Sequence, residues 1–529
     1  MTIGRPTTLA LNGMVATPHY LASAAGLKVL TDGGTAMDAA VTANAVLTVI
    51  YPDQTSIGGD CLLLAYDAAT RSLHGLNGSG AAPAAATASK LREAGATRMP
   101  RDGIETVTVP GTIDAWDAAL TRFGRFSLYR ALQPAIAYAR DGFPVSPRVS
   151  TSITAQRTAL EANEALRRIY LPNGVPPKAG ERLLLPELAQ TLELLAHEGR
   201  DAFYTGPIAA KIIATAARLN GVLSEVDLVA HRAEWVEPIR SVYRGIQVAS
   251  MPPNSQGLTA LLGLNLIQQT TPSGSWGAAL HLHPMIEATK LAFAARDREL
   301  ADPRLIPIDT DRLLSADFAA DLWRSFDPKR AMIGAPQRVG DTVFVCAVDR
   351  DGNAASLIQS IYQGFGSRVV ADDTGVLLQN RGSYFSLKPG HPNELAGGKR
   401  PLHTLMPAML LRDGELLGPI GTQGGDAQAQ VLMQLVSNLI DFDMAPQEAI
   451  EAPRWLAGGR DDLDGTLVKL EARFDLAAVV GLRALGHTVE ATHAWDVDFG
   501  HAQMILRDAA TGLLRGAADP RADGAAIGY

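Results

Sequence analysis

The sequence of residues 342–348 reads Thr342-Val343-Phe344-Val345-Cys346-Ala347-Val348, an uninterrupted run of apolar and β-branched side chains. Such a run predicts a buried β-strand. The polar segment 349–353 predicts a hairpin turn, and residues 355–360 predict the returning strand. Residues 325–341, before the run, contain Pro, Gly, Lys and Arg at positions that break every period, so we interpret them as an exposed linker. A buried hairpin therefore starts abruptly at a threonine.

A threonine in this position has two interpretations. Strand chemistry alone favours a β-branched residue that merely opens the strand. A threonine hydroxyl is a poor nucleophile unless a base lies beside it, but a chain cut before Thr342 would supply its own α-amine. The reference pKa of such an amine, about 7.7 to 8.0, leaves a useful fraction unprotonated at neutral pH. Cys346 shares the strand parity of Thr342, and we interpret it as a small buried hydrophobic residue.

Composition excludes several classes of protein. Of the 529 residues, 47% are hydrophobic and 19% are charged, which excludes wholesale disorder and allows three or four domains or one large layered body. The net charge is −8 and no cluster of Lys and Arg could track phosphates, so nucleic acid is not an expected partner. Cys61 and Cys346 cannot form a disulfide framework or a thiolate zinc site.

The sequence also argues against a membrane or metal-dependent protein. The N-terminus lacks the apolar stretch of a signal peptide, and the most apolar segments, such as 39–50, fall short of the roughly 18 residues of a membrane span. We expect a cytoplasmic protein without membrane contact. His281 and His283 stand two apart and could share a strand face, but without a third ligand we expect a loop or surface role and no metal.

Periodicity predicts a mixed but helix-rich N-terminal two-thirds. The helices expected over the whole chain are two within 20–50 and one each at 114–123, 128–141, 188–197, 208–219, 286–300 and 426–440. The further strands expected are 61–67, 73–77, 240–251, 375–378 and 406–411.

Short motifs in a fixed order run along nearly the whole chain. They are MVATPH at 14–19, GGTAMDAAV at 33–41, GG at 58–59, VPGT at 109–112, YRG at 243–245, PPNSQG at 252–257, VDRDGN at 348–353, FGS at 365–367, KRPL at 399–402, GG at 424–425 and EAIEAPR at 448–454. With this order the sequence resembles the gamma-glutamyltranspeptidase family, whose members are N-terminal-nucleophile hydrolases that cut themselves to expose a threonine.

The resemblance implies an α+β fold, a four-layer αββα sandwich with a helix-rich periphery. It also implies autocatalytic cleavage between Asp341 and Thr342. The products would be a large chain of residues 1–341 and a small chain of residues 342–529, which together form one composite domain. This αβ heterodimer could pair further into a heterotetramer.

The same resemblance implies roles for four residues. Thr342 would be the nucleophile and its amine the base of an acyl-enzyme cycle, and Ser360 matches a second hydroxyl that supports the nucleophile. Gly424 and Gly425 match the oxyanion-hole pair, where glycines let backbone N–H groups approach the oxyanion. The alternatives are an ordinary strand serine for Ser360 and a turn before a helix for the glycines. No cofactor is implied, because protein atoms supply every catalytic group.

The substrate-binding positions depart from the family pattern. Ser79 stands where an arginine holds the substrate α-carboxylate, and the three residues that hold the α-amino group correspond to Tyr362, Arg381 and Tyr384. His403 and Thr404 replace a pair of serines. Because Arg381 would repel an ammonium group, we hypothesise that it binds an anionic group, helped by His403, Thr404 and Tyr362. The alternative is that Arg381 pairs structurally with a nearby carboxylate.

These departures favour one of three functions. The first is a self-processing threonine amidohydrolase acting on a small carboxylate-bearing amide, oxamate-like or glutaryl-like, as in the oxamate amidohydrolase branch of the family. The second is a γ-glutamyl hydrolase or transpeptidase acting on glutathione-type substrates. The third is an inactive relative that uses the cleft for binding. The sequence does not separate hydrolysis from transfer to an amine.

Overall fold

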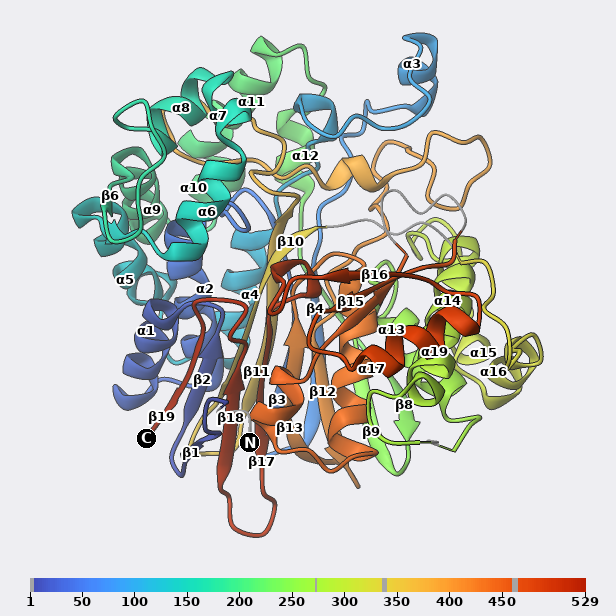
Figure 1. Ribbon diagram of the computed structural model, residues 1–529. Helices are drawn as coiled ribbons and strands as arrows, with labels where there is room; N and C mark the ends of the chain where they lie inside the picture. Colours follow the sequence, from blue (N-terminus) through green and yellow to red (C-terminus); the bar gives the residue numbers. More distant parts are fainter. Residues whose placement is uncertain (1–3, 272–273, 335–339, 459–464) are drawn as a thin grey trace.

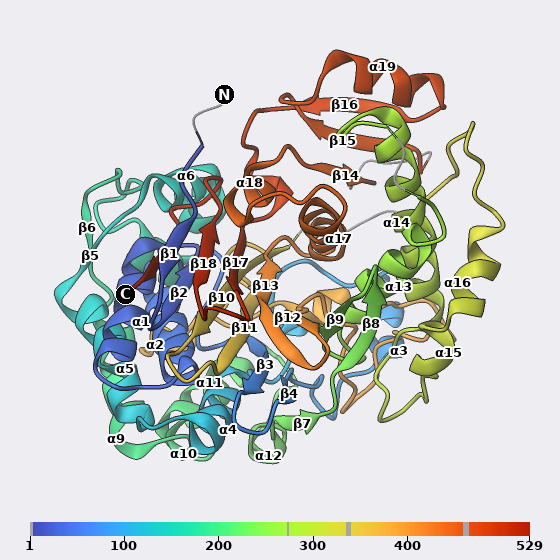
Figure 2. The same ribbon diagram turned by 90° about the horizontal axis from the view of Figure 1, so that it is seen from below.

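Two antiparallel sheets of seven strands each face one another in the computed structural model, which describes residues 4–271, 274–334, 340–458 and 465–529 (Figures 1 and 2). The first sheet has the order β19 (Ala525–Gly528), β2 (Met14–Thr17), β10 (Asp341–Val348), β11 (Ala354–Tyr362), β3 (Asp60–Asp67), β4 (Ser72–Gly78) and β7 (Glu234–Val236). The second sheet has the order β1 (Thr8–Ala10), β18 (Leu514–Ala518), β17 (Ala502–Arg507), β13 (Glu415–Thr422), β12 (Ala408–Arg412), β9 (Ile246–Ser250) and β8 (Ile239–Tyr243).

Helices cover the outer face of each sheet (Figure 2). The helices on the side of the first sheet include α1 (Tyr20–Thr31), α2 (Ala36–Ile50), α4 (Thr112–Phe123), α5 (Leu128–Asp141) and α9 (Pro186–Glu198). Those on the side of the second sheet include α13 (Gly257–Ile267), α14 (Ala279–Glu299), α17 (Ala427–Ile440) and α18 (Pro446–Glu451). The order of layers is therefore helix, sheet, sheet, helix.

Strand β10 shows why its residues form the centre of this arrangement. Val343, Val345 and Ala347 belong to the core between the first sheet and its helices. Phe344 and Cys346 belong to the core between the two sheets. Alternate side chains of a strand point to opposite faces, and both faces of β10 are apolar, so this strand is buried on both sides. The predicted four-layer αββα sandwich is confirmed.

Helix α2 is buried, and the loop that follows it, residues 51–54, leads to strand β11. All its residues are buried, which its many small side chains permit between β10, β11 and α5. Its N-terminus is closed by a capping box in which Thr35 and Asp38 each bind the other's backbone N–H. The helix ends at Ile50, and Gln54, four residues later, is already bonded to β11 through its backbone, Ile361 N donating to Gln54 O at 3.3 Å.

Each sheet combines strands from both sides of the Asp341–Thr342 bond. In the first sheet β10 pairs with β2 on one edge and β11 on the other, and β11 pairs with β3. In the second sheet β12 pairs with β9. A cut at residue 341 would therefore leave two chains joined by continuous ladders of backbone hydrogen bonds.

The remaining elements form the periphery. A smaller sheet contains β14 (Trp455–Ala457), β15 (Leu467–Glu471) and β16 (Thr488–Thr492), next to α19 (Leu476–Ala484), and β5 (Phe143–Pro144) pairs with β6 (Arg182–Leu183). The other helices are α3 (Ala88–Glu93), η1 (Ile104–Thr106), α6 (Pro147–Ala155), α7 (Arg157–Glu161), α8 (Glu164–Tyr170), α10 (Asp201–Tyr204), α11 (Pro207–Arg218), α12 (Glu225–Ala230), α15 (Thr310–Leu313), α16 (Ala316–Trp323), η2 (Arg381–Tyr384) and η3 (Val497–Phe499). Among the described residues, none of the helices combines the length and apolarity that a bilayer crossing requires.

Several sequence predictions need correction. Residues 240–251 form a hairpin, β8 and β9, instead of one strand followed by a turn, and residues 375–378 make only isolated bridges. The linker is not exposed throughout: Gly340 is buried, and β10 begins at Asp341, one residue before the expected threonine. Residues 335–339 of that linker lie outside the described part of the chain.

Candidate active site

Two hydroxyl groups converge on the carbonyl of Asp341. Thr342 is 1% exposed, and its Oγ1 donates to the Asp341 carbonyl oxygen at 2.6 Å. Ser360 on β11 donates its Oγ to the same oxygen at 2.5 Å and accepts the N–H of Tyr362. These bonds polarise the carbonyl that joins residues 341 and 342, and they place the threonine hydroxyl directly beside it. The Thr342–Ser360 pair is thus built around one peptide bond.

The glycine pair lies next to this bond. Gly424 and Gly425 have φ of +129° and +59°, conformations that side-chain-bearing residues rarely adopt, and they lead directly into α17. Gly340 passes between Gly425 and the ring of Tyr362: a Cβ on Gly340 would lie 3.2 Å from Gly425 Cα and 3.1 Å from that ring. The uncut chain therefore fills the space in front of the glycines with its own residues.

Arg381 is a buried guanidinium with spare hydrogen-bonding capacity. Its Nη1 donates to Thr404 Oγ1 at 3.1 Å, and its Cζ lies 4.1 Å from the centre of the Tyr362 ring. Nε and Nη2 are buried without a hydrogen-bond partner, and in the part of the chain that the structure describes Arg381 forms no ion pair. The arginine is fully buried, and burial lowers its pKa. These contacts count against a structural partner for Arg381 among the described carboxylates.

His403 is bonded to its neighbours through both ring nitrogens. Its Nε2 lies 3.0 Å from Asp60 Oδ2, and its Nδ1 accepts the N–H of Leu405. Burial and the nearby Arg381 lower the pKa of His403 to about 4, so the ring is neutral and donates to Asp60. Both ring nitrogens are occupied, so neither is free to bind an anion directly.

The hydroxyl of Ser79 is bonded to neighbouring polar side chains. Its hydroxyl donates to Asn77 Oδ1 at 2.7 Å and lies 3.4 Å from Asn254 Oδ1. The following residue, Gly80, donates its N–H to Asp60 Oδ1. Ser79 is therefore connected to the site through the turn that Asp60 secures and through Asn254, whose backbone carbonyl accepts the N–H of His403.

Tyr384 contacts a carboxylate that the sequence analysis missed. Its hydroxyl donates to Asp426 Oδ1 at 2.7 Å, and Arg296 of α14 binds the same oxygen at 2.9 Å. Gln256 links the glycine pair to Thr404, the partner of Arg381, because its Nε2 donates to the carbonyl oxygens of both Thr404 and Gly425. Asp60, Gln256 and Asp426 had a sequence signal, since each lies in or beside a glycine-containing motif, whereas Arg296, within a helix, had none.

Comparison with known proteins decides the family. The family model described as gamma-glutamyltranspeptidase matches residues 22–529. The chain belongs to the gamma-glutamyltranspeptidase family. It is accordingly an amide-bond hydrolase of the N-terminal-nucleophile type, as predicted.

Similar members of the gamma-glutamyltranspeptidase family match over almost the full length. A glutathione hydrolase-like YwrD proenzyme of Bacillus subtilis is 40% identical, covering 97% of this chain and 98% of its own. An oxamate amidohydrolase proenzyme of Klebsiella pneumoniae is 38% identical, covering 99% of both chains. The crystal structure of a cephalosporin acylase from Bacillus halodurans superposes with a TM-score of 0.94 at 37% identity, covering 99% of this chain and 97% of its own.

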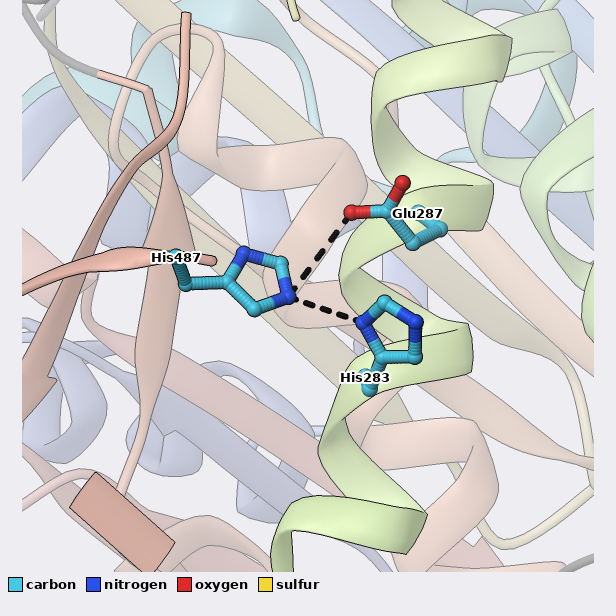
Figure 3. A group of neighbouring side chains, drawn as sticks. All are labelled: His283, Glu287 and His487. Carbon is cyan, nitrogen blue, oxygen red and sulfur yellow. Dashed lines mark hydrogen bonds and ion pairs between the residues drawn. The ribbon is translucent and has the colours of Figure 1, made fainter. Parts of the chain in front are cut away.

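A second polar cluster in this gamma-glutamyltranspeptidase family member involves one of the histidines noted in the sequence (Figure 3). His281 and His283 lie buried in helix α14, so the expectation of a strand face, or of a loop or surface role, was wrong. His283 Nδ1 lies 2.8 Å from His487 Nε2, which in turn lies 3.8 Å from Glu287 Oε1. Two imidazoles and one carboxylate are a ligand set typical of zinc.

Two distances nevertheless indicate that the cluster is complete without an ion. Lys290 Nζ lies 2.9 Å from Glu287 Oε1 and donates to Met332 O at 2.7 Å, so an ammonium group already neutralises the buried carboxylate. The 2.8 Å between the two ring nitrogens is a hydrogen bond. Ligands about 2.0 to 2.1 Å from a tetrahedral zinc would be separated by about 3.3 Å. We assign the cluster a structural role, which joins α14 to the segment around Met332.

Substituting Lys290 by methionine should destabilise the protein by about 3 to 5 kcal/mol, because it leaves the Glu287 carboxylate buried and uncompensated. The midpoint of urea unfolding, with the cysteines kept reduced, measures this loss. A second substitution, Glu287→Gln, should restore much of it. If Lys290→Met alone unfolded at the midpoint of the wild type, the ion pair would not have the assigned role.

Proposed function

We propose that the protein is a self-processing threonine amidohydrolase that cleaves a small carboxylate-bearing amide. One observation supports this most strongly: the fully buried Arg381 offers Nε and Nη2 without partners. These two nitrogens lie on one edge of the guanidinium, the edge that binds a carboxylate through two parallel hydrogen bonds. A buried arginine that lacks a protein carboxylate is matched best by a substrate that brings one.

The first chemical step we propose is self-cleavage between Asp341 and Thr342. Thr342 Oγ attacks the Asp341 carbonyl carbon, the C–N bond breaks, and the new α-amine takes the proton. Water then hydrolyses the ester, leaving a carboxylate on Asp341 and the free hydroxyl and amine on Thr342. The Thr342 and Ser360 hydroxyls within 2.6 Å of the carbonyl oxygen support this proposal, as do the relatives named proenzymes. The interleaved sheets would keep the large chain 1–341 and the small chain 342–529 together.

Substrate hydrolysis would use the hydroxyl and the new α-amine of Thr342. The Thr342 amine would take the hydroxyl proton as the oxygen attacks the substrate amide, and the N–H groups of Gly424 and Gly425 would stabilise the oxyanion. Ser360 would hold the threonine in place, and water would release the acyl group. Arg381, with Thr404 and Tyr362 beside it, would bind the substrate carboxylate, while Tyr384 and His403 support the pocket from Asp426 and Asp60.

The substrate class follows from charge. A γ-glutamyl group carries an ammonium, which the arginine would repel in a buried site. An oxamate-like or glutaryl-like amide carries only the anion, and one similar protein is named an oxamate amidohydrolase. Another is named glutathione hydrolase-like, so the γ-glutamyl reaction is the competing candidate.

A substrate panel tests this proposal. Initial rates should be compared for oxamate, glutaryl-anilide and γ-glutamyl-anilide with the cleaved protein, and we expect turnover of one or both of the first two. Mass spectrometry after mixing should show an acyl group on the small chain. Turnover of γ-glutamyl-anilide alone would contradict the proposed anion site. If the cleaved protein receives an acyl group from none of the three compounds, the inactive relative is favoured.

Other expectations from the sequence stay predictions. They are the cytoplasmic location, the absence of a cofactor or metal, and the pairing of two cleaved units into a heterotetramer.

A further inference from the structure

A half-buried arginine outside the catalytic groups lies close to the scissile bond. Arg148 is the second residue of α6 (Pro147–Ala155). The negative charges of Asp53, Asp341 and Asp523 are near enough to raise its pKa. Its Nε is buried without a hydrogen-bond partner. Opposite charges nearby offset the cost of removing a guanidinium from water, and one of these three carboxyl groups belongs to the residue that precedes the scissile bond.

One amide connects this arginine to the nucleophile. With the Gln54 side chain oriented to satisfy both neighbours, its nitrogen donates to the Thr342 carbonyl oxygen at 2.7 Å and its oxygen accepts from Arg148 Nη2 at 2.6 Å. The loop that carries Gln54 is itself fixed to the end of β11, because Phe365 donates its N–H to the Asp53 carbonyl. The guanidinium is thus linked to the backbone of Thr342 through a single side-chain amide.

The electrostatics of Asp341 point to the same arginine. Burial, together with the charges of Asp53 and Asp498, raises the pKa of this carboxyl to about 6, although Arg148 and the Gly364 N–H act to lower it. Arg148 therefore favours the ionised form of Asp341 near neutral pH. Arg148 thus acts on both sides of the scissile bond: its charge acts on the Asp341 carboxyl, and through Gln54 it is linked to the Thr342 carbonyl.

We propose that Arg148, acting through Gln54 and on Asp341, is a positioning residue for cleavage of the Asp341–Thr342 bond. It holds the two residues so that the Thr342 hydroxyl stays beside the Asp341 carbonyl; Arg148 does not exchange a proton in the step. The proposal rests on the self-cleavage proposed above. Because a displacement of about 1 Å can slow a positioned reaction about 100-fold, loss of this contact should be visible in the cleavage rate.

The test measures the first-order cleavage rate of freshly synthesised chains between about pH 5 and 8, by the appearance of the small chain on denaturing gels. Arg148→Gln should cleave at least about tenfold more slowly at neutral pH. Arg148 holds the ionised Asp341 carboxylate, so the cleavage rate should fall as acid protonates that group. In Arg148→Gln this fall should come at a higher pH than in the wild type, because the pKa of Asp341 rises when the cation is removed. Arg148→Lys keeps the charge and should keep the wild-type pH midpoint.

Two controls make the result decisive. Arg218→Gln removes an exposed arginine paired with Asp372 and should change neither rate nor midpoint. Asp341→Asn removes the titrating group, so its cleavage should be slow and independent of pH over the acid range. The proposal is overturned if Arg148→Gln cleaves at the wild-type rate, or more slowly with an unchanged midpoint. A wild-type chain that never cleaves would instead refute the proposed function, so the two failures are distinct.

Discussion

Thr342→Ala should leave the protein as one uncut chain without amidase activity. The substitution removes the hydroxyl that lies beside the Asp341 carbonyl, so the peptide bond has no internal nucleophile. The uncut chain also keeps Gly340 between Tyr362 and Gly425, where a substrate would have to enter. Denaturing electrophoresis and intact mass give the result: one species for Thr342→Ala, and two for the wild type, the smaller starting at Thr342.

Thr342→Ser is the matched variant, because it keeps the hydroxyl and loses only the methyl group. We expect it to cleave, more slowly than the wild type, and to retain part of the activity. The thermal midpoint of Thr342→Ala should stay close to that of an uncut wild-type chain, since alanine keeps the Cβ and the Ser360 hydroxyl still bonds the Asp341 carbonyl. Cleavage of Thr342→Ala at the same bond would show that another group is the nucleophile.

Arg381→Gln should lower kcat/KM for an acid-bearing amide such as oxamate by about 100-fold, or about 2.7 kcal/mol. The loss corresponds to a bidentate, charge-assisted contact in a site from which water is excluded. A neutral amide of the same size lacks the carboxylate, so its slow turnover should be unchanged or slightly faster. Steady-state rates on the two substrates give the comparison, measured on protein that has already cleaved.

Thr404→Val is the control for Arg381→Gln, because it removes the one hydrogen bond that holds Nη1 and keeps the charge. Loss of a single bond of this kind should cost about tenfold on the acid-bearing substrate. Equal losses on the acid-bearing and neutral amides would show that Arg381 supports the fold of the pocket and does not recognise an anion.

Local patterns predicted much of the framework. The capped, Ala-rich α2, the β3–β4 hairpin, the β10–β11 hairpin and α17 all lie within a few residues of their expected positions. Each has a strong local signal: a helix cap, a strand of continuous apolar residues, or glycines before a helix. Weaker signals failed. Helix α14 begins seven residues earlier than expected, because its first turns carry His281 and His283 in a stretch without amphipathic periodicity.

The candidate site was predicted less completely, because its groups come from distant segments. Thr342 and Ser360 lie on neighbouring strands and could be paired from the hairpin alone. The contacts of Arg381 with Thr404, of His403 with Asp60 and of Tyr384 with Asp426 each join different segments. Local sequence carries no information on such contacts, since they depend on how the two sheets stack.

The sequence by itself indicated the family and the threonine that opens a buried strand, and the resemblance implied an arginine where the family binds an ammonium group. These are statements about residue type and order, which the chain carries directly. Only the tertiary structure decided that Arg381 has two unpaired buried nitrogens, that His403 is turned toward Asp60, and that Gln54 links Arg148 to Thr342. The reason is physical: whether a buried polar group is satisfied depends on the neighbours that packing brings within about 3 Å.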